Sequence, residues 1–228
     1  MLKRTIFFAL KSSLPVMLGY IAIGSAFGLI MQNIGYPIIL TLFMSVVIYA
    51  GAGQYAAAGL FAAAAGYLEI ALTIFLINSR HIVYGFSMRD KFNNTAPYTP
   101  YLIFGLTDET FGLLSTIKTP TDLPTARVYF YITLFNQLSW VAGSVAGFIA
   151  GKVIPFDFRG AEFALTALFV VLLLEQWKNR SENAPFIIAA VSAALALLIF
   201  GAENMLIAAF VLSLIGAAGA SIRRGKVA

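Results

Sequence analysis

Long apolar stretches recur along the whole of this 228-residue chain, and they determine its fold class. A stretch of roughly 17 to 25 apolar residues crosses a bilayer as a helix, because a helix satisfies its own backbone polar groups where water is absent. Sixty per cent of the residues are hydrophobic and 11 per cent are charged, which exceeds the apolar content of ordinary soluble domains. The sequence therefore predicts an all-α, polytopic helical membrane protein with a single transmembrane domain over residues 1–228.

Turn-forming segments divide the chain into about eight predicted transmembrane helices, with possible re-entrant or broken segments. Segments such as "RDKFNNTAPYTP" and "KTPTDLPTAR" carry the prolines and charges that end apolar runs. The fourth and seventh stretches are short for full spans, so a seven-helix alternative stays open. The predicted spans are residues 14–33, 38–61, 67–88, 101–117, 129–150, 161–177, 185–200 and 205–221.

The basic residues of the loops predict the orientation of these helices. With eight spans, ten lysines and arginines fall on the side that carries both termini, and four fall on the other side: Arg89, Lys91, Lys152 and Arg159. Cytoplasmic loops carry the excess of such residues. We therefore expect a multi-pass membrane protein with both termini cytoplasmic. The basic residues behind the net charge of +5 then serve to orient the protein in the membrane, and no nucleic-acid partner is expected.

Charged and polar side chains interrupt the third and fourth predicted spans. Asn78, Arg80 and His81 lie in the third span, while Asp108 and Glu109 fall in the middle of the fourth. A charge at such depth is costly and is normally paired inside the bundle or in a wet cavity. Adjacent carboxylates point about 100° apart on a helix, so at most one can pair directly with Arg80. The other is left for substrate, water or a proton, although a purely structural ion pair is the competing interpretation.

The second and fifth spans contain further candidates. Gly51, Gly53 and Gln54 interrupt "IYAGAGQYAAAGL", where an unwound backbone would expose amides and carbonyls to a small zwitterion. Close helix packing is the alternative. The segment "FNQLSW" adds Gln137, whose alternative role is that of a polar anchor near the membrane interface.

Two pairs of glycines are related by a spacing near 120 residues. Gly24 and Gly28 of the first span correspond in this way to Gly143 and Gly147 of the fifth. An internal duplication would explain the spacing. Small residues four apart are also expected wherever membrane helices pack closely, so both interpretations stay open.

The sequence lacks the residues that several classes of function require. There is no cysteine and only one histidine, so a metal site built on these ligands is not expected. The motifs GxxxxGK[ST], HExxH and GxSxG are absent. We expect no cofactor and no enzymatic activity, and any energy for transport would come from an ion gradient or the substrate gradient.

Four stretches resemble the AzlC family in order and spacing, over about residues 12 to 220: "MSVVIYAGAGQYAAAGL", "LTIFLINSRHIVYGFSM", "FGLTDETFGLL" and "NQLSWVAGSVAG". The resemblance implies a plasma-membrane exporter of branched-chain amino acids and related hydrophobic analogues. It also implies a small AzlD-type membrane subunit as partner. Three family elements match Gly51, Gly53 and Gln54; Asn78, Arg80 and His81; and Thr107, Asp108 and Glu109.

The combined hypothesis is secondary export of a small aliphatic amino acid. Proton coupling is the preferred form, because Asp108, Glu109 and His81 could titrate in a low-dielectric interior. A channel-like pore would use the same buried groups without obligatory alternation, and a structural scaffold for the partner subunit would use them only for assembly.

Overall fold

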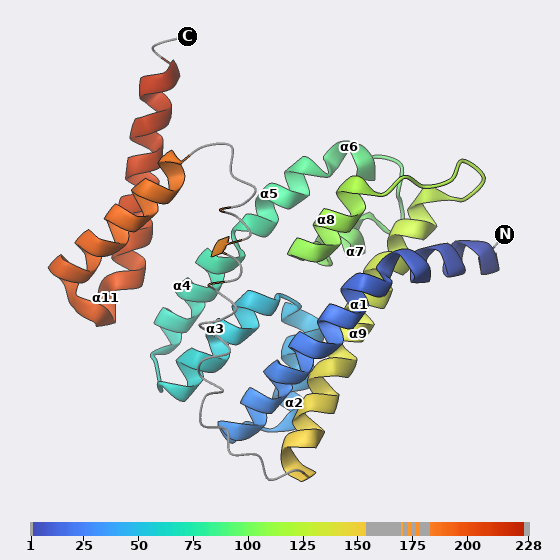
Figure 1. Cartoon of the computed structure of the whole chain (residues 1–228), viewed down its shortest axis with the longest axis horizontal. Helices are drawn as coiled ribbons and strands as arrows, with labels where there is room; N and C mark the ends of the chain where they lie inside the picture. The colour runs from blue at the N-terminus through green and yellow to red at the C-terminus, as the bar shows by residue number, and fades with distance from the viewer. Residues whose placement is uncertain (1, 154–169, 171–172, 175–176, 178–182, 226–228) are drawn as a thin grey trace. The chain divides into compact units, whose positions relative to one another are not determined.

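The computed structural model describes residues 2–153, 170, 173–174, 177 and 183–225, which form helices joined by short turns and contain no strand (Figure 1). The chain divides into two compact units, residues 1–168 and 169–228, and each is considered by itself. Among the described residues, four helices are long and apolar enough to cross a bilayer. The prediction of an all-α, polytopic membrane protein is confirmed. The single-domain assignment stays a prediction.

Helices α1 (Leu2–Asn33) and α9 (Thr125–Val153) pack side by side in the first unit (Figure 1). Their backbones touch at the glycines that the sequence singled out. A Cβ on Gly28 would lie 1.9 Å from the Ser144 carbonyl oxygen, and one on Gly147 would lie 1.9 Å from that of Ser25. The contact is reciprocal, because each glycine meets the serine of the other helix. Ser144 and Gly147 lie 119 residues after Ser25 and Gly28. The two helices therefore present equivalent surfaces to each other.

Helix α1 begins earlier than the predicted span of residues 14–33. Residues 2–13 continue the same helix, because Thr5, Ala9 and Ser13 recur every four residues and are fully buried. Pro15 lies inside the helix. A proline inside a helix removes one backbone hydrogen bond and favours a bend, and Figure 1 shows that α1 changes direction toward its N-terminal end.

The second predicted span is broken into three pieces. These are α2 (Ile38–Phe43), a π-helical turn η1 (Met44–Ile48) and α3 (Gly51–Ala62). Tyr49 has a positive φ of 41° and Ala50 is extended, with φ −140°. The break therefore precedes Gly51, and the predicted unwinding at Gly51, Gly53 and Gln54 is wrong because these three residues are helical.

The third span keeps its predicted place but contains one tightened turn. It consists of α4 (Tyr67–Asn78) and α5 (Arg80–Ser87), followed by the short α6 (Arg89–Phe92). At the junction the Ser79 amide and hydroxyl both donate to the Leu76 carbonyl, at 3.3 and 2.7 Å. The fourth span is α7 (Thr99–Phe104) and α8 (Asp108–Thr116), separated by three non-helical residues. The predicted span at 101–117 is therefore broken, which the expectation of re-entrant or broken segments allowed.

The second unit contains α11 (Ala184–Gly225), which reverses at Gly201 (Figure 1). Gly201 has φ 73°, a conformation that glycine adopts without a steric penalty. The two arms contact each other where Gly216 meets the side chain of Ile188. This agrees with predicted helices at 185–200 and 205–221. The predicted span at 161–177 lies largely outside the described residues.

Candidate functional site

Helix α8 begins at the two adjacent carboxylates. Thr107 is the N-cap, with an extended backbone and an Oγ1 that accepts from the Thr110 amide at 3.3 Å. Asp108 and Glu109 form the first turn, where the positive end of the helix dipole favours negative charge. The break between α7 and α8 thus places both acids at a helix N-terminus, instead of in the middle of a continuous span.

Asp108 pairs with Arg80 of α5. The distance from Arg80 Nη2 to Asp108 Oδ2 is 2.8 Å, and the Tyr84 hydroxyl donates to Asp108 Oδ1 at 2.5 Å. The side chains of the ion pair are 26% and 28% exposed. The Tyr84 ring stacks on Phe111 of α8, with centroids 4.5 Å apart. Both oxygens of Asp108 are therefore held from α5.

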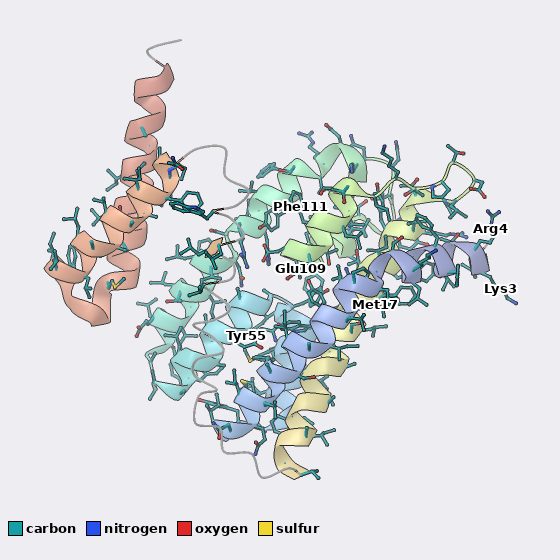
Figure 2. All side chains as sticks on the ribbon, viewed as in Figure 1. Lys3, Arg4, Met17, Tyr55, Glu109 and Phe111 are labelled. Carbon is teal, nitrogen blue, oxygen red and sulfur yellow. The ribbon has the colours of Figure 1, made fainter. Side chains whose placement is uncertain are left out.

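Glu109 has a different partner. Its Oε2 accepts a hydrogen bond of 2.6 Å from the Tyr20 hydroxyl of α1, and the same hydroxyl lies 2.5 Å from Thr107 Oγ1. Glu109 lies at the start of α8 and retains an exposed side chain (Figure 2). One carboxylate is thus ion-paired, while the neighbouring one is hydrogen-bonded to a neutral group and open to further partners.

The hydrogen bonds continue from α8 into α9. Thr107 Oγ1 and Thr110 Oγ1 are 2.9 Å apart, and Asn136 Nδ2 donates to Thr110 Oγ1 at 3.0 Å. These bonds form two groups that meet at the neighbouring Asp108 and Glu109, and we name the residues of both groups the polar cluster: Tyr20, Arg80, Tyr84, Thr107, Asp108, Glu109, Thr110 and Asn136. Within the described part of the chain, the buried atoms Arg80 Nε and Asn136 Oδ1 have no hydrogen-bond partner. The cluster therefore retains one donor and one acceptor.

Gln54 holds the break between η1 and α3. Its side chain is fully buried. Gln54 Oε1 accepts from the Ala50 amide at 3.2 Å and from Trp140 Nε1 at 3.0 Å, while Nε2 donates to Ser45 Oγ at 3.3 Å. We name Ser45, Ala50, Gln54 and Trp140 the glutamine junction. The Tyr20 and Trp140 rings, 5.5 Å apart, connect this junction with the polar cluster.

Gly51 and Gly53 are sites of close contact in α3. A Cβ on Gly51 would lie 3.2 Å from the Trp140 ring, and one on Gly53 would lie 2.7 Å from Asn78 Nδ2. Asn78 Oδ1 is buried and has no partner among the described residues. The small residue at 53 thus lets the Asn78 amide, two residues before Arg80, approach α3.

The remaining two candidates lie at the edges of this region. Gln137 accepts from the Tyr101 hydroxyl at 2.7 Å and donates to the Val46 carbonyl at 3.0 Å, so it joins α7 to η1 through α9. His81 lies 5.8 Å from the Tyr84 ring, measured between centroids. It also lines a cavity of about 420 Å³ whose other lining residues are Ile82, Gly85, Phe86, Arg89, Phe92, Asn93, Thr99 and Ile103.

Sequence reasoning did not identify Tyr20, Ser45 or Thr110 as parts of the site. The local sequence could have identified Thr110, because Thr107 and Thr110 have the spacing of an N-cap residue and the third residue of its helix. No sequence pattern indicated Tyr20, because tyrosines are common in membrane spans near the interface. Its partners lie 87 and 89 residues away in the chain. Among the residues searched, no group of three or more histidine and carboxylate side chains could hold a metal ion.

Comparisons with known proteins identify the family of the chain. A family model described as AzlC protein matches residues 15–154. The branched-chain amino acid transport protein AzlC of Bacillus subtilis is 32% identical over 201 residues, 88% of this chain and 79% of that protein. An uncharacterized membrane protein of Helicobacter pylori is 37% identical over 204 residues, 90% of each chain. Inner membrane protein YgaZ of Escherichia coli is 29% identical over 179 residues, 75% of this chain and 73% of that protein. No solved structure matches at a significant level.

Proposed function

The chain belongs to the AzlC family, and on this premise we propose that it exports branched-chain amino acids across the plasma membrane. The substrates are leucine, valine, isoleucine and related hydrophobic analogues, and the chain acts as the large subunit of a secondary transporter with a small AzlD-type subunit. A relative named for branched-chain amino acid transport supports the substrate class. Export direction, proton coupling and the small subunit are parts of the proposal.

The observation that carries the proposal is the unequal use of the two acids near Arg80. Asp108 is ion-paired with Arg80 Nη2 and hydrogen-bonded to Tyr84, whereas Glu109 is hydrogen-bonded to a tyrosine and exposed. A zwitterionic amino acid has a carboxylate for a guanidinium and an ammonium for a carboxylate. Arg80 Nε is a spare donor for the first, and Glu109 is the spare acceptor for the second.

The cavity beside α5 supports an aliphatic side chain on the substrate. His81 lies next to Arg80 in the sequence and lines the cavity, whose walls include Ile82, Phe86 and Ile103. Apolar walls with a few polar groups at the ends are typical of small-molecule sites. We assign this cavity to the path of the branched side chain.

Breaks in the helices support alternation between two states. The second and fourth predicted spans are interrupted next to the glutamine junction and the polar cluster, respectively. Discontinuous membrane helices that meet near a site are typical of secondary transporters. In the proposed cycle Glu109 exchanges the substrate ammonium for a proton, and Asp108 and His81 are the neighbouring groups able to take part. The inner-membrane location and cytoplasmic termini complete the proposal.

Transport into inverted membrane vesicles tests the function directly. Radiolabelled leucine, valine, isoleucine and methionine are offered to vesicles that contain this chain, with and without the small subunit and with and without a proton gradient. Export in the cell corresponds to uptake by inverted vesicles. We expect saturable uptake of the branched-chain substrates that requires the small subunit and increases with the gradient.

Two further measurements separate the alternatives. Counterflow from preloaded liposomes occurs with an alternating transporter but not with a passive pore, so linear, non-saturable flux would reject the proposal. If substitutions in the polar cluster reduce only co-purification with the small subunit, and transport per assembled complex is unchanged, the site is a scaffold.

A further inference from the structure

A hollow of about 430 Å³ lies beside the first three turns of α1, outside the polar cluster. It combines basic and apolar side chains from α1 with two residues of the segment before α9. Figure 2 shows Lys3 and Arg4 at the N-terminal end of α1. The lining residues are Lys3, Arg4, Phe7, Phe8, Lys11, Pro120 and Leu123.

The length of α1 places this hollow at the level of the lipid headgroups. The helix has 32 residues, which is about 48 Å at 1.5 Å per residue. The hydrocarbon core is only about 30 Å thick. About 12 residues therefore extend beyond the core, and the basic residues identify the N-terminal end as the part that does so. Pro15 falls close to this boundary.

The charges of the hollow are only partly neutralised. Arg4 Nη1 forms an ion pair of 2.9 Å with Asp122 Oδ2. In the described part of the chain, neither Lys3 nor Lys11 has a carboxylate within salt-bridge distance. Both lysine side chains are exposed. Two positive charges are thus available to an anion.

Exposed apolar side chains lie next to these charges. Phe7 is 68% exposed, and Leu10 and Leu14 are 37% and 49% exposed on the same helix. A soluble anion gains nothing from exposed rings and aliphatic groups. A molecule with an anionic head and an apolar chain uses both features, because the head contacts the lysines and the chain covers the leucines.

We propose that this hollow binds an anionic phospholipid, with the headgroup phosphate between Lys3 and Lys11 and one acyl chain along Phe7, Leu10 and Leu14. Arg4 stays paired with Asp122 and forms one wall of the site. The proposal requires only that α1 crosses the bilayer, so it is independent of the substrate and of the direction of transport.

Native mass spectrometry of the purified full chain tests the proposal with phosphatidylglycerol and phosphatidylcholine as competing probes. The wild type should retain phosphatidylglycerol preferentially. Lys3→Gln and Lys11→Gln should each reduce this preference by about five-fold, the effect of one basic residue near an anionic surface. Lys152→Gln, at the far end of α9, is the matched control because it removes one charge without touching the hollow, and it should leave the preference unchanged.

Three results would overturn the proposal. The first is equal retention of the two lipids by the wild type, and the second is a loss in Lys152→Gln as large as in the two hollow variants. The third is displacement of bound phosphatidylglycerol by millimolar inorganic phosphate, which would identify a site for a soluble anion.

Discussion

Replacing Arg80 removes the cation of the ion pair that joins α5 to α8, and the structure allows its effect on stability to be separated from its effect on transport. Breaking a buried pair costs about 3 to 5 kcal/mol, because one charge is left unpaired. Here the side chains are 26% and 28% exposed, and Tyr84 still donates to Asp108 at 2.5 Å. We therefore expect Arg80→Ala to lose about 2 to 3 kcal/mol of unfolding free energy, below the range for a fully buried pair.

The assay combines thermal unfolding in detergent with transport into inverted vesicles. For a chain of this length, the expected loss corresponds to a decrease in Tm of roughly 5 to 10 °C. Arg80→Lys retains the charge but loses the planar fork of the guanidinium. It should therefore assemble normally and lose most transport.

A second substitution identifies which function of Arg80 matters. Arg80→Ala combined with Asp108→Asn removes both charges of the pair and should restore the Tm without restoring export. Arg80→Ala combined with Glu109→Gln is the matched control and should not restore the Tm, because Glu109 is bonded to Tyr20 and not to Arg80. Recovery of both Tm and export in the first double variant would refute a substrate role for Arg80.

Three further results are expected. Gly53→Leu should abolish export while the protein still reaches the membrane, because even a Cβ at this position would lie 2.7 Å from Asn78 Nδ2. Gly19→Leu is the control and should be tolerated, because a Cβ at that position meets nothing within 4 Å. Tyr84→Phe retains the stacked ring but removes the hydrogen bond to Asp108. The free energy of unfolding should therefore fall by about 1 to 2 kcal/mol and the transport rate should fall several-fold. An unchanged transport rate would exclude a positioning role for Tyr84. A reporter inserted within residues 89–95 should be external, and a cytoplasmic signal would reject the proposed orientation.

The fold class was predictable because apolar length is a local property of the sequence. The reversal at Gly201 was also accessible, because the predicted helices at 185–200 and 205–221 leave a turn there. The glycine pairs of α1 and α9 were visible too, but the sequence did not show that they contact each other. The earlier start of α1 was not predictable, because basic and polar residues such as Lys3 and Thr5 are typical of an amphipathic segment outside the span. Thr5 is fully buried, and its place in the interior depends on neighbours that the sequence does not display.

The charged residues of the candidate site could be predicted from the sequence, but the residues that pair with each of them could not. An arginine inside an apolar span requires an acid, so the sequence alone connects Arg80 with the pair Asp108 and Glu109. The choice between the two acids depends on Thr107, which ends the non-helical linker and starts α8 so that Asp108 faces α5. The hydrogen bond from Tyr20 to Glu109 depends on how α1 packs, and no local pattern predicts it.

The position of the break in the second span shows why local propensity was insufficient. Glycine weakens a helix through backbone entropy, which favours unwinding at Gly51 or Gly53. The backbone instead opens at Tyr49 and Ala50, although alanine is the best helix former. Opening there leaves the Ala50 amide without a helical partner, and Gln54 Oε1 accepts from it.

Gln54 accepts from Ala50 in a fixed orientation because Trp140, 86 residues further along the chain, donates to the same oxygen. Gly51 lets that indole ring approach, since a Cβ would already lie 3.2 Å from it. The glycine and glutamine recognised in the sequence thus support a break that occurs beside them. Their effect on transport is expected to operate through the position of α3 against Asn78 and Trp140, and Gln54→Ala should therefore impair both stability and export by leaving the Trp140 and Ala50 donors unpaired.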